Sequence, residues 1–167
     1  MIQPNKILVI RFSSLGDLIL TSPIFRELRR IFPGANLNLL TSVGFGDVLD
    51  NNPHLDRIIK HPRKENFEQL DQLIEELQAE EFDLIYDAHR SMRSRWIVSR
   101  LTAFGTKKKL AVWKINKRTV NRKLLIHLGW NRLQQGLSQR EQWLLPLKQH
   151  APHGLDASTE LFPDQED

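Results

Sequence analysis

The chain has 167 residues, of which 40% are hydrophobic and 26% are charged, as expected of one globular domain. It contains no cysteine and no apolar run of transmembrane length, which excludes disulfides, thiolate metal sites and a membrane-spanning helix in this sequence. The net charge of +4 conceals a basic segment, because residues 89–148 carry 15 Lys and Arg but a single acid, Glu141.

The first part of the chain predicts two strands joined by a loop and a helix. Residues 6–12 form a continuous apolar run, which is typical of a strand buried on both faces. Apolar spacing over residues 23–32 predicts a helix. Either Ser22 is its N-cap, or the helix begins earlier, near Asp17, and is kinked. Residues 36–42 predict the second strand.

The rest of the chain continues the alternation of strands and helices. Further strands are expected at residues 57–61, 83–89 and 108–113. Helices are expected within residues 44–56, 66–82, 91–105, 119–133 and 138–150, the last opened by a capping box of Ser138 and Glu141. This order predicts an α/β fold, with a Rossmann-like, mostly parallel sheet and helices on both faces. Helical spacing places Phe67 and Trp96 on buried faces of their helices.

The loop after the first strand reads RFSSLGDLILTSP, residues 11–23, and lies where chemistry is expected. In parallel sheets, ligands bind beyond the carboxyl ends of the strands. Ser13 and Ser14 are small enough to let a ligand approach the backbone, and Gly16 permits a tight turn with positive φ. Asp17 is either a carboxylate that faces a ligand and accepts a proton, or simply the cap of the next helix. The spacing alone favours the cap.

Several ordered stretches of the chain resemble one enzyme family. They read KILVIRFSSLGDLILTSPIFRELRRIFPGANLNLLT, NNPHLDRIIKHPR, FDLIYDAHRSMRSRWIVSRL and NRKLL. Together they resemble the heptosyltransferases of glycosyltransferase family 9, which add heptose to the inner core of lipopolysaccharide. The resemblance is specific for the family rather than for one member of it.

The resemblance implies that this chain is the N-terminal half of a GT-B glycosyltransferase, an architecture of two Rossmann-like domains with the active site between them. In such enzymes the N-terminal domain binds the acceptor and the C-terminal domain binds ADP-heptose, and transfer inverts the anomeric centre without a metal. The Asp of the family's S-x-G-D turn, here Asp17, would be the general base. We therefore expect no cofactor and no metal, with ADP-heptose as the donor substrate.

The resemblance also gives the basic residues a partner, because lipopolysaccharide core acceptors carry phosphates and carboxylates. In the family, acceptor contacts come from the segment after the third strand and from later basic loops. Strand-end geometry adds two further arginines. The expected acceptor-binding residues are Ser13, Ser14, Gly16, Arg63, Lys64, Arg90, Arg93 and Arg118.

The resemblance also divides the chain. Residues 1–150 are expected to form the acceptor-binding domain, and residues 151–167 a linker or disordered tail that leads to an absent C-terminal donor-binding domain. On this interpretation the chain alone does not transfer sugar. A cytoplasmic location is expected, with peripheral contact at the inner face of the inner membrane.

Other classes of function stay open. The basic segment over residues 89–148 indicates either solvated helix faces or a surface for an anionic partner. The sequence contains no recognisable RNA- or DNA-binding signature, so no nucleic-acid partner is expected. The alternatives are a non-catalytic module that binds an anionic glycan or nucleic acid, and a domain that pairs with a separate donor-binding chain.

Overall fold

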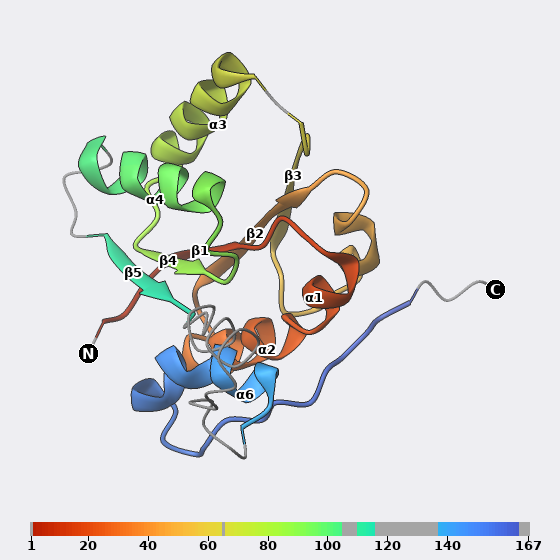
Figure 1. Cartoon of the computed structure of the whole chain (residues 1–167). Coiled ribbons are helices and arrows are strands. Elements are labelled where there is room, and N and C mark those ends of the chain that lie inside the picture. The colour runs from red at the N-terminus through yellow and green to blue at the C-terminus, as the bar shows by residue number, and fades with distance from the viewer. Residues whose placement is uncertain (1, 65, 105–109, 116–136, 164–167) are drawn as a thin grey trace, which may run out of the picture.

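A computed structural model describes residues 2–64, 66–104, 110–115 and 137–163 (Figure 1). Its centre is a five-stranded parallel sheet in the order β3-β2-β1-β4-β5. The strands are β1 (Lys6–Ile10), β2 (Asn36–Ser42), β3 (Arg57–His61), β4 (Leu84–Asp87) and β5 (Ala111–Lys114). The predicted α/β fold with a parallel sheet is therefore confirmed.

Helices cover both faces of this sheet. They are α1 (Leu15–Ile19), α2 (Ser22–Ile31), α3 (Phe67–Ala79), α4 (Met92–Phe104) and α6 (Gln139–Leu144), with the 3-10 turns η1 (Gly46–Leu49) and η2 (Leu145–His150). Helices α3 and α4 pack on one face, and α2 and α6 pack on the other (Figure 1). Across the described ranges, no helix is both long and apolar enough to cross a membrane.

Strand β1 lies at the centre of the sheet and is buried on both faces. Ile7 and Val9 contribute to the core under α2, whereas Leu8 and Ile10 contribute to the core under α3 and α4. Parallel partners flank it on both sides, β2 and β4. A strand covered on both faces needs a continuous apolar run, which is why the period-two alternation of a half-exposed strand is missing here.

The region between β1 and β2 forms two helices rather than one. Helix α1 begins at Leu15, and α2 follows with Thr21, not Ser22, as its N-cap. The Thr21 hydroxyl donates to the carbonyl oxygen of Asp17 at 2.7 Å, so it satisfies a helix-end acceptor where the two helices meet. Pro23 lies in the first turn of α2, where a backbone N–H has no helical partner to lose.

Two aromatic residues predicted on buried helix faces are exposed instead. Phe67 is 86% exposed and Trp96 is 49% exposed, so those predictions were wrong. Phe67 is the first residue of α3, before the turns that cover the sheet. Trp96 precedes Ile97, which is fully buried, and adjacent helical residues point about 100° apart, so only one of the two faces the sheet.

Residues 151–163 run past α2 without forming a helix or strand (Figure 1). Glu160 fixes this run to the domain. Its carboxylate accepts a hydrogen bond from Arg26 Nη1 at 2.6 Å and lies 3.0 Å from His54 Nε2. Its backbone N–H donates to the Ser22 hydroxyl at 2.9 Å. The segment is thus held by specific polar contacts.

Other expectations concern the last third of the chain. The capping box opens α6 as predicted, since the Glu141 N–H donates to Ser138 Oγ at 3.3 Å and the Ser138 N–H donates to Glu141 Oε2 at 2.6 Å. The helix expected over residues 119–133 falls outside the described residues. The division into a domain of residues 1–150 and a linker of residues 151–167 stays a prediction.

The Glu160 contacts predict a pH-dependent contribution to stability. Burial raises the pKa of Glu160, but hydrogen bonds from Arg26 and His54 outweigh it, so this pKa lies below its usual value of 4.5. A carboxyl group with a lowered pKa stabilises the fold above its unfolded pKa and loses that contribution as the pH falls through the folded pKa. We expect Glu160→Gln to lower the free energy of unfolding by about 1 kcal/mol near neutral pH.

Urea denaturation measures this effect, and the same substitution should cost less as the pH is lowered through the folded pKa of Glu160, because protonation removes the charge that Arg26 and His54 contact. Glu75→Gln, at an exposed position of α3, is the control. Destabilisation by Glu160→Gln that stays constant as the pH is lowered would contradict the prediction.

Candidate functional site

The candidate site lies at the carboxyl ends of β1 and β4. The parallel register places Ile10 of β1 beside Asp87 of β4, so the residues that follow Ile10 lie next to the turn that follows Asp87. Both segments therefore meet at the edge of the sheet where parallel α/β folds bind their ligands.

Arg11 is the central residue of this edge, although it was not predicted as a site residue. Its side chain is 4% exposed and forms an ion pair with Asp17. Its Nη1 donates to the Ala88 carbonyl oxygen at 2.6 Å, and its guanidinium lies 4.7 Å from the ring centre of Trp143. Burial lowers the pKa of Arg11, whereas the carboxylates of Asp17 and Asp87 oppose that shift. Arginine has so high a pKa that the group stays a cation.

Asp17 does not cap α1. The N-cap is Ser14, and Asp17 is the third residue of the helix. Its Oδ2 atom pairs with Arg11, while 36% of the side chain stays exposed. The carboxylate is therefore oriented from the protein side and open on the solvent side, where a ligand hydroxyl can approach it.

The predicted small residues surround this carboxylate in the chain. Ser13 is half-buried, and Ser14 and Gly16 are exposed. Gly16 lies within α1 and its φ is not positive, so the tight turn expected of it is not formed. A Cβ atom at Gly16 would meet no atom within 4 Å, which leaves open space one residue before Asp17.

Asp87 organises the turn after β4. Its Oδ1 accepts hydrogen bonds from the backbone N–H groups of His89 at 3.1 Å and Arg90 at 2.7 Å, and its Oδ2 accepts one from Ser94 Oγ at 3.2 Å. Arg90 has a φ of 50°, which residues with a side chain rarely adopt. Its Nη1 donates to the Ile115 carbonyl oxygen at 3.0 Å. Asp87 thus stabilises the uncommon backbone that aims Arg90 at the end of β5.

Arg93 joins the loop after β3 to the start of α4. Its guanidinium lies 4.0 Å from the ring centre of Phe12, the residue after Arg11. Its Nη2 also donates to the Pro62 carbonyl oxygen at 3.0 Å. These contacts bring the loops after β1 and β3 to the same edge as Asp17.

The remaining basic residues predicted for the acceptor are placed only in part. Arg63 and Lys64 follow Pro62 and are exposed, so they extend the same edge. Arg118 falls outside the described residues. Acceptor binding by any of these side chains stays a prediction.

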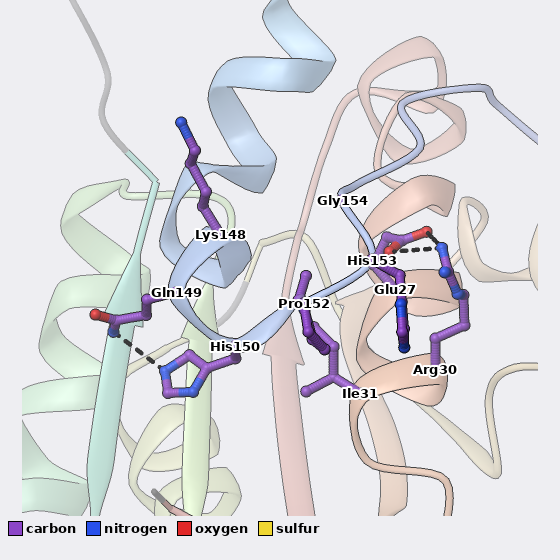
Figure 2. Close-up of a pocket in the computed structure, with 10 residues that line it drawn as sticks. Glu27, Arg30, Ile31, Lys148, Gln149, His150, Pro152, His153 and Gly154 are labelled. Carbon is purple, nitrogen blue, oxygen red and sulfur yellow. Dashed lines mark hydrogen bonds and ion pairs between the residues drawn. The ribbon is translucent and has the colours of Figure 1, made fainter.

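A separate cavity of about 380 Å³ lies between the end of α2 and the turn after η2 (Figure 2). Glu27, Arg30, His150 and His153 contribute to its lining, and Glu27 accepts a hydrogen bond from Arg30 Nη1 at 3.1 Å. Of the catalytic and acceptor-binding residues that were predicted from the sequence and that the structure describes, none lines this cavity. In the part of the chain that is described, no group of three or more acidic, histidine or cysteine side chains is placed to hold a metal ion.

Comparisons with known proteins agree with the resemblance found in the sequence. No family model matches the chain. It is 28% identical over 111 residues to lipopolysaccharide heptosyltransferase 1 of Escherichia coli K12, a match covering 61% of this chain and 34% of the relative. It is 27% identical over 101 residues to lipopolysaccharide heptosyltransferase 1 of Pseudomonas aeruginosa, covering 55% and 28% respectively. The match therefore spans about a third of the length of these relatives.

Solved structures show the same fold. A glycosyl transferase of family 9 from Veillonella parvula superposes with a TM-score of 0.66 and 18% identity, covering 93% of this chain and 43% of that one. The E. coli heptosyltransferase WaaC, solved with ADP-2-deoxy-2-fluoro heptose, gives a TM-score of 0.59 and 24% identity, covering 87% and 47%. These comparisons confirm the resemblance to family 9 heptosyltransferases and the Rossmann-like parallel α/β fold.

The ion pair between buried Arg11 and half-exposed Asp17 can be measured with a double-mutant cycle of Arg11→Met and Asp17→Asn. Asp17→Asn leaves a buried guanidinium with a weaker partner, so we expect it to lower the free energy of unfolding by about 1–3 kcal/mol. Because the two groups touch, we expect a coupling energy of about 1–2 kcal/mol from urea denaturation.

The exposed pair of Arg57 and Glu80 provides the comparison, since the Arg57 side chain is 57% exposed. Its coupling energy should be below about 1 kcal/mol. A coupling between Arg11 and Asp17 no larger than that of the exposed pair would contradict the electrostatic role assigned to Arg11.

Proposed function

Since this chain carries a heptosyltransferase-like domain of the family 9 type, we propose that it binds the acceptor in a glycosyl transfer from ADP-heptose to the lipopolysaccharide inner core. The observation that best supports this is the position of Asp17. Its carboxylate lies beyond the carboxyl end of β1, is held by Arg11 and stays 36% exposed. A general base needs this combination of fixed orientation and access to the reacting hydroxyl.

The proposed chemistry is a single displacement. The Asp17 carboxylate accepts the proton of an acceptor hydroxyl while that oxygen forms a bond to the anomeric carbon of the donor. The bond from the anomeric carbon to ADP breaks on the opposite face, and ADP leaves with the electron pair. The configuration at the anomeric carbon is therefore inverted. Arg11 engages Oδ2 and keeps the carboxylate turned toward the edge of the sheet.

The basic residues around Asp17 suit an anionic acceptor. Arg63, Lys64 and Arg93 lie in or against the loop after β3, and Arg90 lies beside the end of β5. Arginine forks and lysine charges bind phosphates and carboxylates strongly. We propose that these side chains orient the acceptor so that one hydroxyl reaches Asp17.

The donor site is proposed to lie in a second domain, either on a longer polypeptide or on a separate chain. The match spans about a third of the curated relatives, and the acceptor half described here offers no separate site that we assign to ADP-heptose. The chain alone is therefore expected to be inactive. A lipid-linked acceptor would bring the domain into peripheral contact with the inner face of the inner membrane.

Binding by the 167-residue chain tests the acceptor assignment without any catalysis. We expect phosphorylated inner-core oligosaccharide to bind at least about tenfold more tightly than ADP-heptose, a difference of about 1.4 kcal/mol, when both are titrated calorimetrically. Dephosphorylated oligosaccharide is the control and should bind more weakly. Tighter binding of ADP-heptose would contradict the assignment.

Catalysis is tested by Asp17→Asn in the protein completed with its donor-binding domain. The amide keeps the shape of the side chain but cannot accept the proton, so we expect the transfer rate to fall by about 10²–10⁴. Asp71→Asn, at an exposed position of α3, is the matched control. Circular dichroism must show that the variant is folded, and a folded variant with near-normal turnover would rule out Asp17 as the base.

A further inference from the structure

A second cavity at the carboxyl edge has no role in the proposed chemistry. It lies between α4 and β5 and has a volume of about 320 Å³. Its lining is contributed by α4, β5 and the turn after β4, through Asp87, Arg90, Arg95, Val98, Ser99, Thr102, Val112 and Lys114. The cavity therefore adjoins the Asp87 turn from the side away from β1, which Asp17 follows.

The charges that line this cavity favour an anion. Arg90, Arg95 and Lys114 are cations, and Asp87 is the single acid among the described lining residues. Asp87 is buried, and both its oxygens already accept hydrogen bonds from the turn that it stabilises. Its charge therefore cancels only one of three cationic charges, and its oxygens are not free to bind a cationic ligand.

Two of these cations have no acidic partner among the described residues. Within the described ranges, neither Arg95 nor Lys114 forms an ion pair. Other cations of the domain do have acidic partners, such as Lys60, which pairs with Asp47 at 2.7 Å and Asp50 at 2.8 Å. Arg95 and Lys114 are both exposed, so solvent screens part of their repulsion, and an anion bound between them would lower it further.

The third cation is held in place. The carbonyl of Ile115 accepts a hydrogen bond from Arg90 Nη1 at 3.0 Å, and the Asp87 carboxylate fixes the Arg90 backbone. The Ser99 hydroxyl adds a neutral donor at the α4 wall. The Thr102 hydroxyl instead donates to the Val98 carbonyl at 2.9 Å, so it contributes little to an anion. Part of the site is thus pre-organised.

We propose that this cavity is a subsite for the phosphate of a sugar phosphate. Three cations suit the two charges of a phosphate monoester better than the single charge of a carboxylate. The volume leaves room for the sugar ring beside the phosphate. Among the described residues, no aromatic side chain lines the cavity, which disfavours a nucleotide or single-stranded nucleic acid that would stack its base.

The assignment of this sugar phosphate to the acceptor rests on the proposed function, but phosphate binding itself does not. In the proposed subsite, Arg90 binds the phosphate together with Arg95 and Lys114. Neither Arg95 nor Lys114 was predicted from the sequence as a site residue. On this arrangement the acceptor is held at its phosphate between α4 and β5, while its reacting hydroxyl lies toward Asp17.

Titration of the full chain with glucose 6-phosphate, followed by NMR amide shifts, tests the subsite. We expect saturable binding with a dissociation constant of about 1 mM or tighter, with the largest shifts between α4 and β5. Arg95→Gln combined with Lys114→Gln should weaken binding at least about tenfold, because two charge-assisted contacts are removed. Arg30→Gln combined with Lys148→Gln, from the other cavity, is the control and should leave binding unchanged.

Each outcome decides the matter. Absence of saturable binding, or equal loss in the control variant, would overturn the subsite. Binding of inorganic phosphate alone as tightly as glucose 6-phosphate would support the phosphate contacts and overturn the sugar part. Preference for vesicles containing phosphatidylglycerol over the sugar phosphate would overturn the sugar-phosphate assignment. Because Asp17 is unchanged and no donor is used, failure here leaves the Asp17 test of transfer unaffected.

Discussion

Parallel pairing of β1 with neighbours on both sides is the constraint on which the rest of this domain depends. A strand in that position must be apolar on both faces. Because neighbouring strands run parallel, helices must connect them, and these helices cover the two faces of the sheet. The same pairing brings the carboxyl ends of β1 and β4 together, with Ile10 beside Asp87. The candidate site is thus a consequence of register, since Arg11 and the Asp87 turn follow those paired residues directly.

Most of the fold could be predicted from the sequence because its signals are local. Apolar runs gave the strands, and the capping box of Ser138 and Glu141 gave the start of α6. The predictions that Phe67 and Trp96 are buried were wrong because burial depends on which helix faces the rest of the chain covers. Periodicity shows that Phe67 belongs to an apolar stripe, but not that the first turn of α3 is left uncovered. The contact of Glu160 with Arg26 could not be predicted either, because it joins segments that are distant in the sequence.

The site was predictable only in part for the same reason. The motif located Asp17, but its partner Arg11 lies within the run KILVIRF, which predicts a strand over residues 6–12 and does not single out Arg11 as a partner of the site. Burial of Arg11 is possible because Ala88 and Trp143, far along the chain, supply a carbonyl and a ring. Likewise, the sequence alone does not distinguish Arg95 and Lys114 from ordinary solvated charges. The fold places both side chains beside one cavity.

We propose above all that the carboxyl edge around Asp17 binds an acceptor sugar in a reactive orientation. A crystal structure of this domain with a phosphorylated inner-core oligosaccharide tests it most directly. We expect one sugar hydroxyl within about 2.6–3.2 Å of the Asp17 carboxylate, the distance that a general base requires. An oligosaccharide bound instead in the cavity beside Glu27 and His150, with no hydroxyl near Asp17, would contradict it.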